Sequence, residues 1–200
     1  MKKSLAINLI LFLFTCNIIA QKRPIKIVDE TINNRIDLYA INENLIDYDI
    51  IVTVKGTGFR ERGGRQRKVR VPATSKVKVN SLIIERDKTP QYIFHVEASD
   101  SLSRRAMRPT PVKIKIDPLK IFILYTFNQC ITCDSLVSSL DRSVYNYNKI
   151  NLSENIEKYK SLEKYIPSLD TITTPILNIG GYILTNLKTV EEVIDKLENE

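Results

Sequence analysis

Lys120-Ile-Phe-Ile-Leu-Tyr-Thr-Phe-Asn-Gln-Cys130-Ile-Thr-Cys133 is the stretch of sequence on which the expected fold depends. The residues after Lys120 form a continuous apolar run up to Tyr125, which is typical of a strand buried on both faces. From Cys130 to Leu140, apolar side chains recur at helical spacing. The stretch therefore predicts a buried strand that leads into a helix, with two cysteines at the junction.

The residues that follow continue this alternation of strand and helix. A second strand is expected at 147–152, and a helix capped by Ser153 is expected up to about Tyr165. Gly180-Gly181 suits the tight turn of a β-hairpin formed by 175–179 and 182–185. A capping box at 189–192 opens a last amphipathic helix. The order β-α-β-α-β-β-α predicts a mixed sheet with helices on its faces.

Two cysteines at the start of a helix have a specific chemical consequence. Cys130 is expected at the helix N-terminus, where free N–H groups and the helix dipole favour a negative charge and hence the reactive thiolate. Cys133 is expected one turn later, where it can resolve a mixed disulfide. A loop closed over three positions constrains the unfolded chain too little to be a useful staple. The spacing therefore predicts a redox pair with Cys130 as nucleophile and Cys133 as resolving thiol.

Residues 119–200 resemble a thioredoxin-superfamily domain of the small glutaredoxin-like kind. The resemblance is carried by Leu124-Tyr-Thr126, Cys130-Ile-Thr-Cys133, Thr173-Thr-Pro175 and Gly180-Gly181. It implies that Thr174 and Pro175 bind the substrate chain beside the sulfurs. It also makes the Thr174–Pro175 bond a candidate cis peptide, the alternative being an ordinary trans proline at the strand entry.

The sequence departs from this family in several places. It contains no Trp, so the Trp-Cys-Gly-Pro-Cys motif of thioredoxins is missing, and neither a Pro nor an aromatic residue separates the cysteines. Phe127 stands where many glutaredoxins have a glutathione-contacting Lys, and Tyr182 stands where an acidic or polar residue is usual. These departures argue against glutathione as a partner. The sequence does not decide whether the pair oxidises, isomerises or reduces its substrates.

Residues 21–118 show period-two patterns separated by turn residues, and no long helical period interrupts them. Such spacing indicates an antiparallel sandwich of immunoglobulin-like size. The expected fold class is therefore multi-domain, with an all-β immunoglobulin-like sandwich (21–118) followed by an α/β thioredoxin fold (119–200). The strands are expected at 35–41, 49–54, 75–82, 91–96 and 111–116.

Residues 1–20 have the pattern of a secretory signal peptide. Lys2 and Lys3 precede an apolar run, and Ala20 is a small residue suited to the position before a cleavage site. The run is short for an anchoring helix. Lipoprotein anchoring through Cys16 is also less favoured, because Thr15 stands where such signals usually have Gly, Ala or Ser. Export to the bacterial periplasm or cell envelope is expected, which leaves Cys130 and Cys133 as the cysteines of the mature chain.

Positive charge is concentrated in the first half of the chain. Residues 21–118 hold twenty Lys and Arg against twelve Asp and Glu, while residues 119–200 hold eight against eleven. The densest run is Arg60–Arg70, interpreted as a solvated hairpin loop with a Gly-Gly turn. Nucleic acid is not an expected partner, because the run has no interleaved aromatic residues and the protein is expected to be exported. Attraction to an anionic envelope surface is a weaker alternative.

The functional hypothesis is exchange of the Cys130–Cys133 disulfide with thiols and disulfides of other exported proteins. No cofactor is needed for this chemistry, and no metal is expected, because structural zinc takes four ligands and the pair offers two. The single histidine, His95, falls in a strand expected in the other half. The alternative is a non-catalytic envelope binding or assembly protein, in which the sandwich recognises a partner and the second domain is a scaffold.

Overall fold

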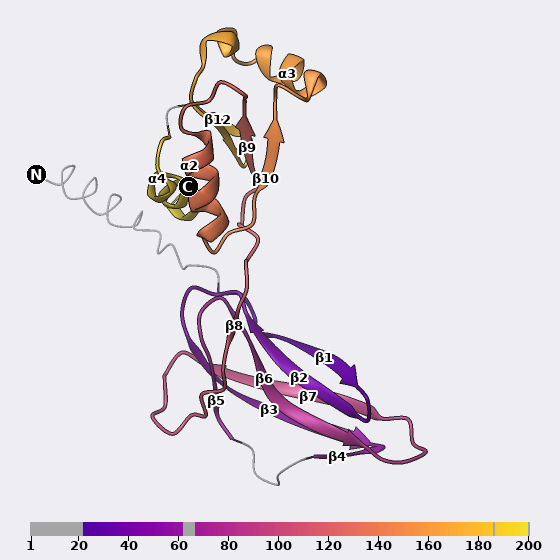
Figure 1. Cartoon of the computed structure of the whole chain (residues 1–200). Coiled ribbons are helices and arrows are strands. Elements are labelled where there is room, and N and C mark those ends of the chain that lie inside the picture. Colours follow the sequence, from indigo (N-terminus) through magenta and orange to yellow (C-terminus); the bar gives the residue numbers. More distant parts are fainter. Residues whose placement is uncertain (1–21, 62–66, 186, 200) are drawn as a thin grey trace, which may run out of the picture.

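The computed structural model of the chain describes residues 22–61, 67–185 and 187–199 (Figure 1). The expected signal peptide, with Cys16, and positions 62–66 of the basic run lie outside the described residues. Within the described part, no helix has the length and apolar character needed to cross a membrane.

The first half of the chain forms two antiparallel sheets, which occupy the lower part of Figure 1. One sheet has the strand order β1-β2-β6-β4, with β8 also paired to β6, and the other has the order β5-β3-β7. The strands of the first sheet are β1 (Lys26–Ile32), β2 (Arg35–Asn42), β4 (Phe59–Glu61), β6 (Ser75–Ile84) and β8 (Val112–Lys113). Those of the second are β3 (Tyr48–Thr57), β5 (Val69–Val71) and β7 (Gln91–Ser99).

Alternating side chains hold these two sheets together. Along β2, Ile36, Leu38 and Ala40 are buried, whereas Arg35 at the start of the strand is exposed. The spacing of the three buried residues is that of a strand with one face on the core. The buried side chains form two clusters that each combine residues from both sheets, so the core lies between the layers. The clusters are Ala40, Tyr48, Ile50, Val69, Val71 and Val77, and Ile36, Leu38, Val54 and Leu82.

A fully buried amide ties the end of β2 to two neighbouring loops. The side chain of Asn42 donates to the carbonyl oxygens of Ile46 (2.8 Å), Val71 (3.2 Å) and Pro72 (3.0 Å). Its own oxygen accepts from the backbone and side-chain N–H groups of Asn44, both at 3.0 Å. Each of these carbonyls would be without this donor if the amide were removed.

Replacement of Asn42 by Ala is therefore expected to lower the free energy of unfolding by about 2–3 kcal/mol, because buried carbonyls lose their donor. Chemical denaturation measures this difference. The matched control is Asn34→Ala, since Asn34 is exposed and its side-chain amide donates to the Ile84 carbonyl alone among the described residues. An equal loss for the two variants would contradict the prediction.

A buried ion pair fixes the loop that follows β7. The side chain of Asp49 on β3 is fully buried and accepts hydrogen bonds from Arg70 on β5 and from the backbone N–H of Ser103. Arg70 also donates to the Ser103 carbonyl at 3.0 Å. The Met107 N–H donates to the Lys68 carbonyl, and the Met107 carbonyl accepts from the Arg70 N–H (2.8 Å each), so Met107 covers the outer edge of β5.

The second half of the chain forms one four-stranded sheet with the order β10-β9-β11-β12. Strand β10 is parallel to β9, and the β9–β11 and β11–β12 pairs are antiparallel. The elements follow one another as β9 (Phe122–Thr126), α2 (Cys133–Arg142), β10 (Asn148–Asn151), α3 (Ile156–Glu163), a 3₁₀ turn η1 (Leu169–Thr171), β11 (Ile176–Ile179), β12 (Tyr182–Leu184) and α4 (Val190–Asn199).

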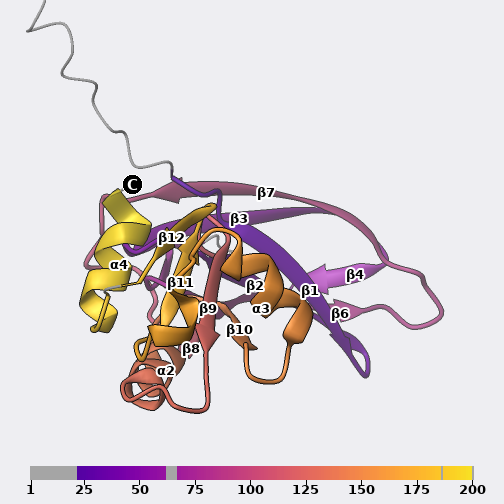
Figure 2. The ribbon, with the colours of Figure 1, turned by 90° about the horizontal axis from the view of Figure 1, so that it is seen from above.

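Neighbouring residues of β9 point into two different cores. Leu124 packs with residues of α2, β11 and α4, whereas Tyr125 packs with Leu162 of α3 and with Leu169 and Ile176. Helices α2 and α4 therefore cover one face of the sheet and α3 the other, as Figures 1 and 2 show. Both faces of β9 are covered, which explains its unbroken apolar sequence.

A short extended segment joins the two halves. Ile116 is 3% exposed, pairs with Tyr145 in a parallel bridge and belongs to the core beneath α2. Its backbone bonds with Val144 and Asn146 are both 2.8 Å long. The Arg23 guanidinium donates to the carbonyl of Asp117 at 2.8 Å, so the start of the first half also contacts this segment.

The expected fold class, an immunoglobulin-like sandwich followed by an α/β thioredoxin fold, is wrong. Among the described residues, strands make up 42% and helices 18%, so this part of the chain is mostly β, with three helices and several antiparallel sheets. In the described part, β9 and β10 are the one parallel pair among the named strands. The strand and helix signals after residue 118 indicate the order of the elements but not how much of the chain is helical. The three helices have ten, eight and ten residues, so the helical share is small.

Candidate redox site

The two cysteines form a disulfide in the loop between β9 and α2, and their Cα atoms are 5.4 Å apart. Strand β9 ends at Thr126, and a turn closed by the bond from the Cys130 N–H to the Phe127 carbonyl (3.2 Å) follows it. The buried strand and the buried start of the helix therefore fix both ends of the loop that carries the sulfurs.

The helix begins at Cys133, three residues later than the sequence predicts. Thr132 is the N-cap residue, and its carbonyl accepts the N–H of Leu136 at 3.1 Å. Cys133 is thus the first helical residue, whereas Cys130 lies before the helix and the position expected for it at the N-terminus is wrong. The backbone N–H groups of the first turn lie next to Cys133, so the helix dipole acts mainly on that sulfur.

The two cysteines differ in exposure. Cys133 is 4% exposed and belongs to the buried side chains, while Cys130 is half-buried. Ile131 between them is 83% exposed. A molecule that approaches the disulfide from solvent therefore meets Ile131 and Cys130 before Cys133.

Hydrogen bonds from the next loop hold the residues before Cys130. The N–H of Asn128 donates to the Ser153 hydroxyl at 3.1 Å, and the Asn151 amide donates to the Asn128 side-chain oxygen at 3.2 Å. Both partners follow or end β10, the strand parallel to β9. The disulfide is therefore presented by a loop whose backbone is fixed on both sides.

The segment Thr173-Thr174-Pro175 lies against the cysteine loop. The N–H of Ile131 donates to the carbonyl of Thr173 at 3.2 Å. The hydroxyl of Thr174 donates to the carbonyl of Thr185 at 2.8 Å, and Pro175 is buried directly before β11. The cysteine loop and the Thr-Pro segment are thus joined through the neighbours of the residues singled out in the sequence, Ile131 beside Cys130 and Thr173 beside Thr174.

The peptide bond between Thr174 and Pro175 is trans. The described residues contain no cis peptide bond, so the candidate cis bond implied by the family resemblance is wrong. The alternative of an ordinary trans proline at the entry of a strand is the one that the structure shows. The place of Pro175 before β11 suits a residue that has no N–H to donate to the sheet.

Sequence reasoning did not single out Ile131, Thr132 or the Thr173 carbonyl. Thr132 is the N-cap residue, yet its buried hydroxyl has no hydrogen-bond partner in the described part of the chain. The preference of Thr for N-cap positions is the signal that could have placed the helix start there. No local signal indicates that the Thr173 carbonyl contacts the cysteine loop, because this contact depends on the pairing of β11 with β9.

Two tyrosines of the second half have a shifted pKa, and both lie at the end of this half that is away from the disulfide. Burial, followed by a hydrogen bond to Glu198, raises the pKa of Tyr145 to about 12. Burial and a hydrogen bond to Asp141 raise the pKa of Tyr147 as well. These bonds fasten α4 and α2 to the core rather than serving the disulfide. No group of three or more metal-ligating His, Cys, Asp or Glu side chains occurs within the described ranges.

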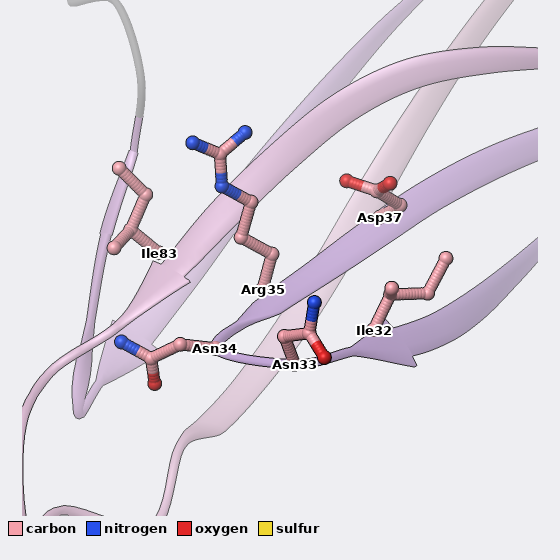
Figure 3. A pocket seen from close by; sticks show the side chains of 6 residues that line it. All are labelled: Ile32, Asn33, Asn34, Arg35, Asp37 and Ile83. Atoms are coloured by element: carbon pink, nitrogen blue, oxygen red, sulfur yellow. The ribbon is translucent and has the colours of Figure 1, made fainter.

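Two surface depressions lie away from the disulfide. One, of about 370 Å³, lies between α3 and the β11–β12 hairpin, where Tyr125, Lys158 and Tyr165 are among the lining residues. The other, of about 550 Å³, lies at the β1–β2 turn and is shown in Figure 3. Neither of these two depressions is lined by Cys130 or Cys133.

No family model, no curated protein and no solved structure matches this chain. Membership of the thioredoxin superfamily, suggested by the motifs, therefore stays a prediction. The chemistry of the site follows from its own residues.

Proposed function

We propose that this protein is an exported thiol–disulfide oxidoreductase that exchanges its Cys130–Cys133 disulfide with thiols of other exported proteins. The supporting observation is the asymmetry of the pair, in which Cys130 is accessible beside the exposed Ile131 and Cys133 is buried at the first turn of α2. An attacking thiolate reaches one sulfur of such a pair and not the other.

A purely structural role explains the pair less well. The bond spans three positions, and the entropic stabilisation falls with loop length, from about 3 kcal/mol for a 15-residue loop. The loop is also held independently of the sulfurs, by the bonds from Cys130 to Phe127 and from Ile131 to Thr173. The disulfide therefore adds little to a backbone that is already fixed.

The exchange is balanced by two substrate thiols. A substrate thiolate attacks the Cys130 sulfur, the Cys130–Cys133 bond breaks, and Cys133 leaves as a thiolate beside the N–H groups of the first helical turn. A second substrate thiolate then attacks the substrate sulfur of the mixed disulfide and releases Cys130. The substrate is oxidised to a disulfide and the protein gains two electrons. In the reverse direction Cys130 attacks a substrate disulfide and Cys133 resolves the intermediate.

The substrate chain is proposed to lie beside Ile131 and the Thr174–Pro175 segment. An exposed apolar side chain next to the sulfurs offers contact to a partly unfolded polypeptide, which exposes apolar side chains of its own. Export, and a place in the bacterial periplasm or envelope, is proposed from the pattern of residues 1–20, which suits an oxidising compartment.

The reduction potential of the pair tests this function. We expect a value between roughly −120 and −270 mV, the range of proteins that exchange disulfides with others, measured by equilibration with glutathione redox buffers. The position within this range would decide between an oxidant and a reductant. A value below about −300 mV, with no activity on reduced or scrambled proteins, would favour the non-catalytic binding or assembly protein instead.

A further inference from the structure

Two arginines flank one isoleucine on the outer face of the first sheet. Arg35 on β2 and Arg60 on β4 are both paired in register with Ile83 on β6, one from each side. Directly paired residues of neighbouring strands point to the same face of a sheet, and each strand adds about 4.8 Å. The two arginine Cα atoms are therefore separated by about 10 Å across Ile83.

The other cations of this face are already paired with carboxylates. Within the described ranges, Arg35 and Arg60 take part in no ion pair, although these ranges stop one residue after Arg60. The cations that are paired are Lys26 with Glu43 (2.6 Å), Lys76 with Glu30, and Lys78 with Asp37 (2.6 Å).

The nearest carboxylates are engaged elsewhere. Asp37 accepts hydrogen bonds from Lys78 and from the Ser81 hydroxyl (2.7 Å). Glu85 accepts from Lys88 at 2.5 Å. These bonds, led in each case by the one from lysine, lower the pKa of both carboxyl groups, so both are ionised and partnered at neutral pH. Arg35 adds a smaller electrostatic attraction to Asp37, and Arg60 adds one to Glu85, but neither arginine is hydrogen-bonded to these carboxylates within the described ranges.

A depression of about 550 Å³ lies beside Arg35 (Figure 3). Ile32, which is 53% exposed, and Ile83 give it an apolar part, and Asn33 and Asn34 of the β1–β2 turn lie at its end. In Figure 3 the Arg35 guanidinium stands between Ile83 and Asp37. The depression therefore combines the Arg35 cation, the Asp37 carboxylate, and amide and apolar groups, whereas Arg60 is placed beside it by its register with Ile83 and is not among its lining residues.

We propose that this surface binds a phosphate ester, with the phosphate held between Arg35 and Arg60 and the organic part against Ile32 and Ile83. A guanidinium presents two parallel N–H groups to an oxyanion. Two guanidiniums on opposite sides suit an anion whose oxygens point to several sides. A phosphate group has such oxygens, whereas the two oxygens of a carboxylate lie on one side. This site is separate from the disulfide and does not depend on its function.

Binding of two probes to the full chain tests the proposal. The probes are inorganic phosphate, followed by calorimetry, and phosphatidylcholine vesicles with and without phosphatidylglycerol, followed by co-sedimentation. Arg35→Gln with Arg60→Gln is expected to weaken binding at least about tenfold, a loss of about 1.4 kcal/mol. The control is Lys113→Gln with Lys149→Gln, which removes the same charge from two other exposed positions and is expected to bind as the unmodified chain does.

Loss of phosphate binding in the arginine variant would indicate a soluble phosphate ester, and loss confined to phosphatidylglycerol vesicles would indicate a lipid headgroup. Either result supports the site. The proposal is overturned if the unmodified chain binds neither probe, or if the arginine variant binds as tightly as the lysine control. Should the double variant not fold, Arg60→Gln alone is expected to weaken binding, and unchanged binding by that variant overturns the proposal equally.

Discussion

Replacement of Cys130 by Ser is expected to reduce the rate of dithiol oxidation by about a thousandfold or more, the size of effect seen when a catalytic nucleophile is removed. The variant has no disulfide to accept the two electrons of a substrate dithiol, and its remaining thiol of the pair, Cys133, is 4% exposed at the buried start of α2. The measurement compares the rate at which the oxidised unmodified protein and the variant convert a dithiol peptide to its disulfide.

The partner variant gives a different result if the two cysteines have the proposed roles. Cys133→Ala retains the accessible Cys130 but cannot resolve, so mixed disulfides with substrates are expected to accumulate and to be visible on non-reducing gels. Cys130→Ser is expected to trap none. Equal trapping by both variants would contradict the assignment of nucleophile and resolving thiol. Undiminished dithiol oxidation by either variant would contradict the proposed function. The trapped species would also identify the substrate.

Replacement of Arg70 by Met is expected to lower the free energy of unfolding by about 3–5 kcal/mol, because it leaves the buried Asp49 carboxylate without its cation. The Asp49 side chain is fully buried and that of Arg70 is 12% exposed. Urea denaturation at neutral pH measures the loss. The control is Lys22→Gln, which removes the exposed pair with Asp100 and is expected to leave the free energy of unfolding nearly unchanged.

The loss is expected to depend on pH in a defined direction. Burial raises the pKa of Asp49, but the hydrogen bonds from Arg70 and the Ser103 N–H outweigh burial and hold that pKa below its ordinary value. The pair therefore stabilises the fold above the ordinary pKa, near pH 4, and this contribution is lost as the pH falls through the lowered value. The difference between Arg70→Met and the unmodified chain should shrink in acid. A difference that is constant with pH would contradict the role of the ionised pair.

Local elements were predictable where a single segment carries the signal. The apolar run 120–125 corresponds to β9, and Gly180-Gly181 occupies a hairpin turn with positive φ at both residues (60° and 97°), which glycine adopts without steric penalty. Boundaries were less predictable: the start of α2 at Cys133 depends on the loop bonds of Cys130 and Ile131. The periodicity of apolar residues gives no information about such bonds.

The sequence by itself determined that two cysteines lie at the junction between a buried strand and a helix, and that the first half is built from strands, because apolar periodicity depends on residues close together in the chain. Only the tertiary structure decided which cysteine is buried and that the Thr173 carbonyl accepts the N–H of Ile131 between the cysteines. It also decided that Arg35 and Arg60 flank Ile83. Each of these depends on the pairing of strands far apart in sequence. Pairing register is set by the packing of whole sheet faces against a core, and no single segment contains that information.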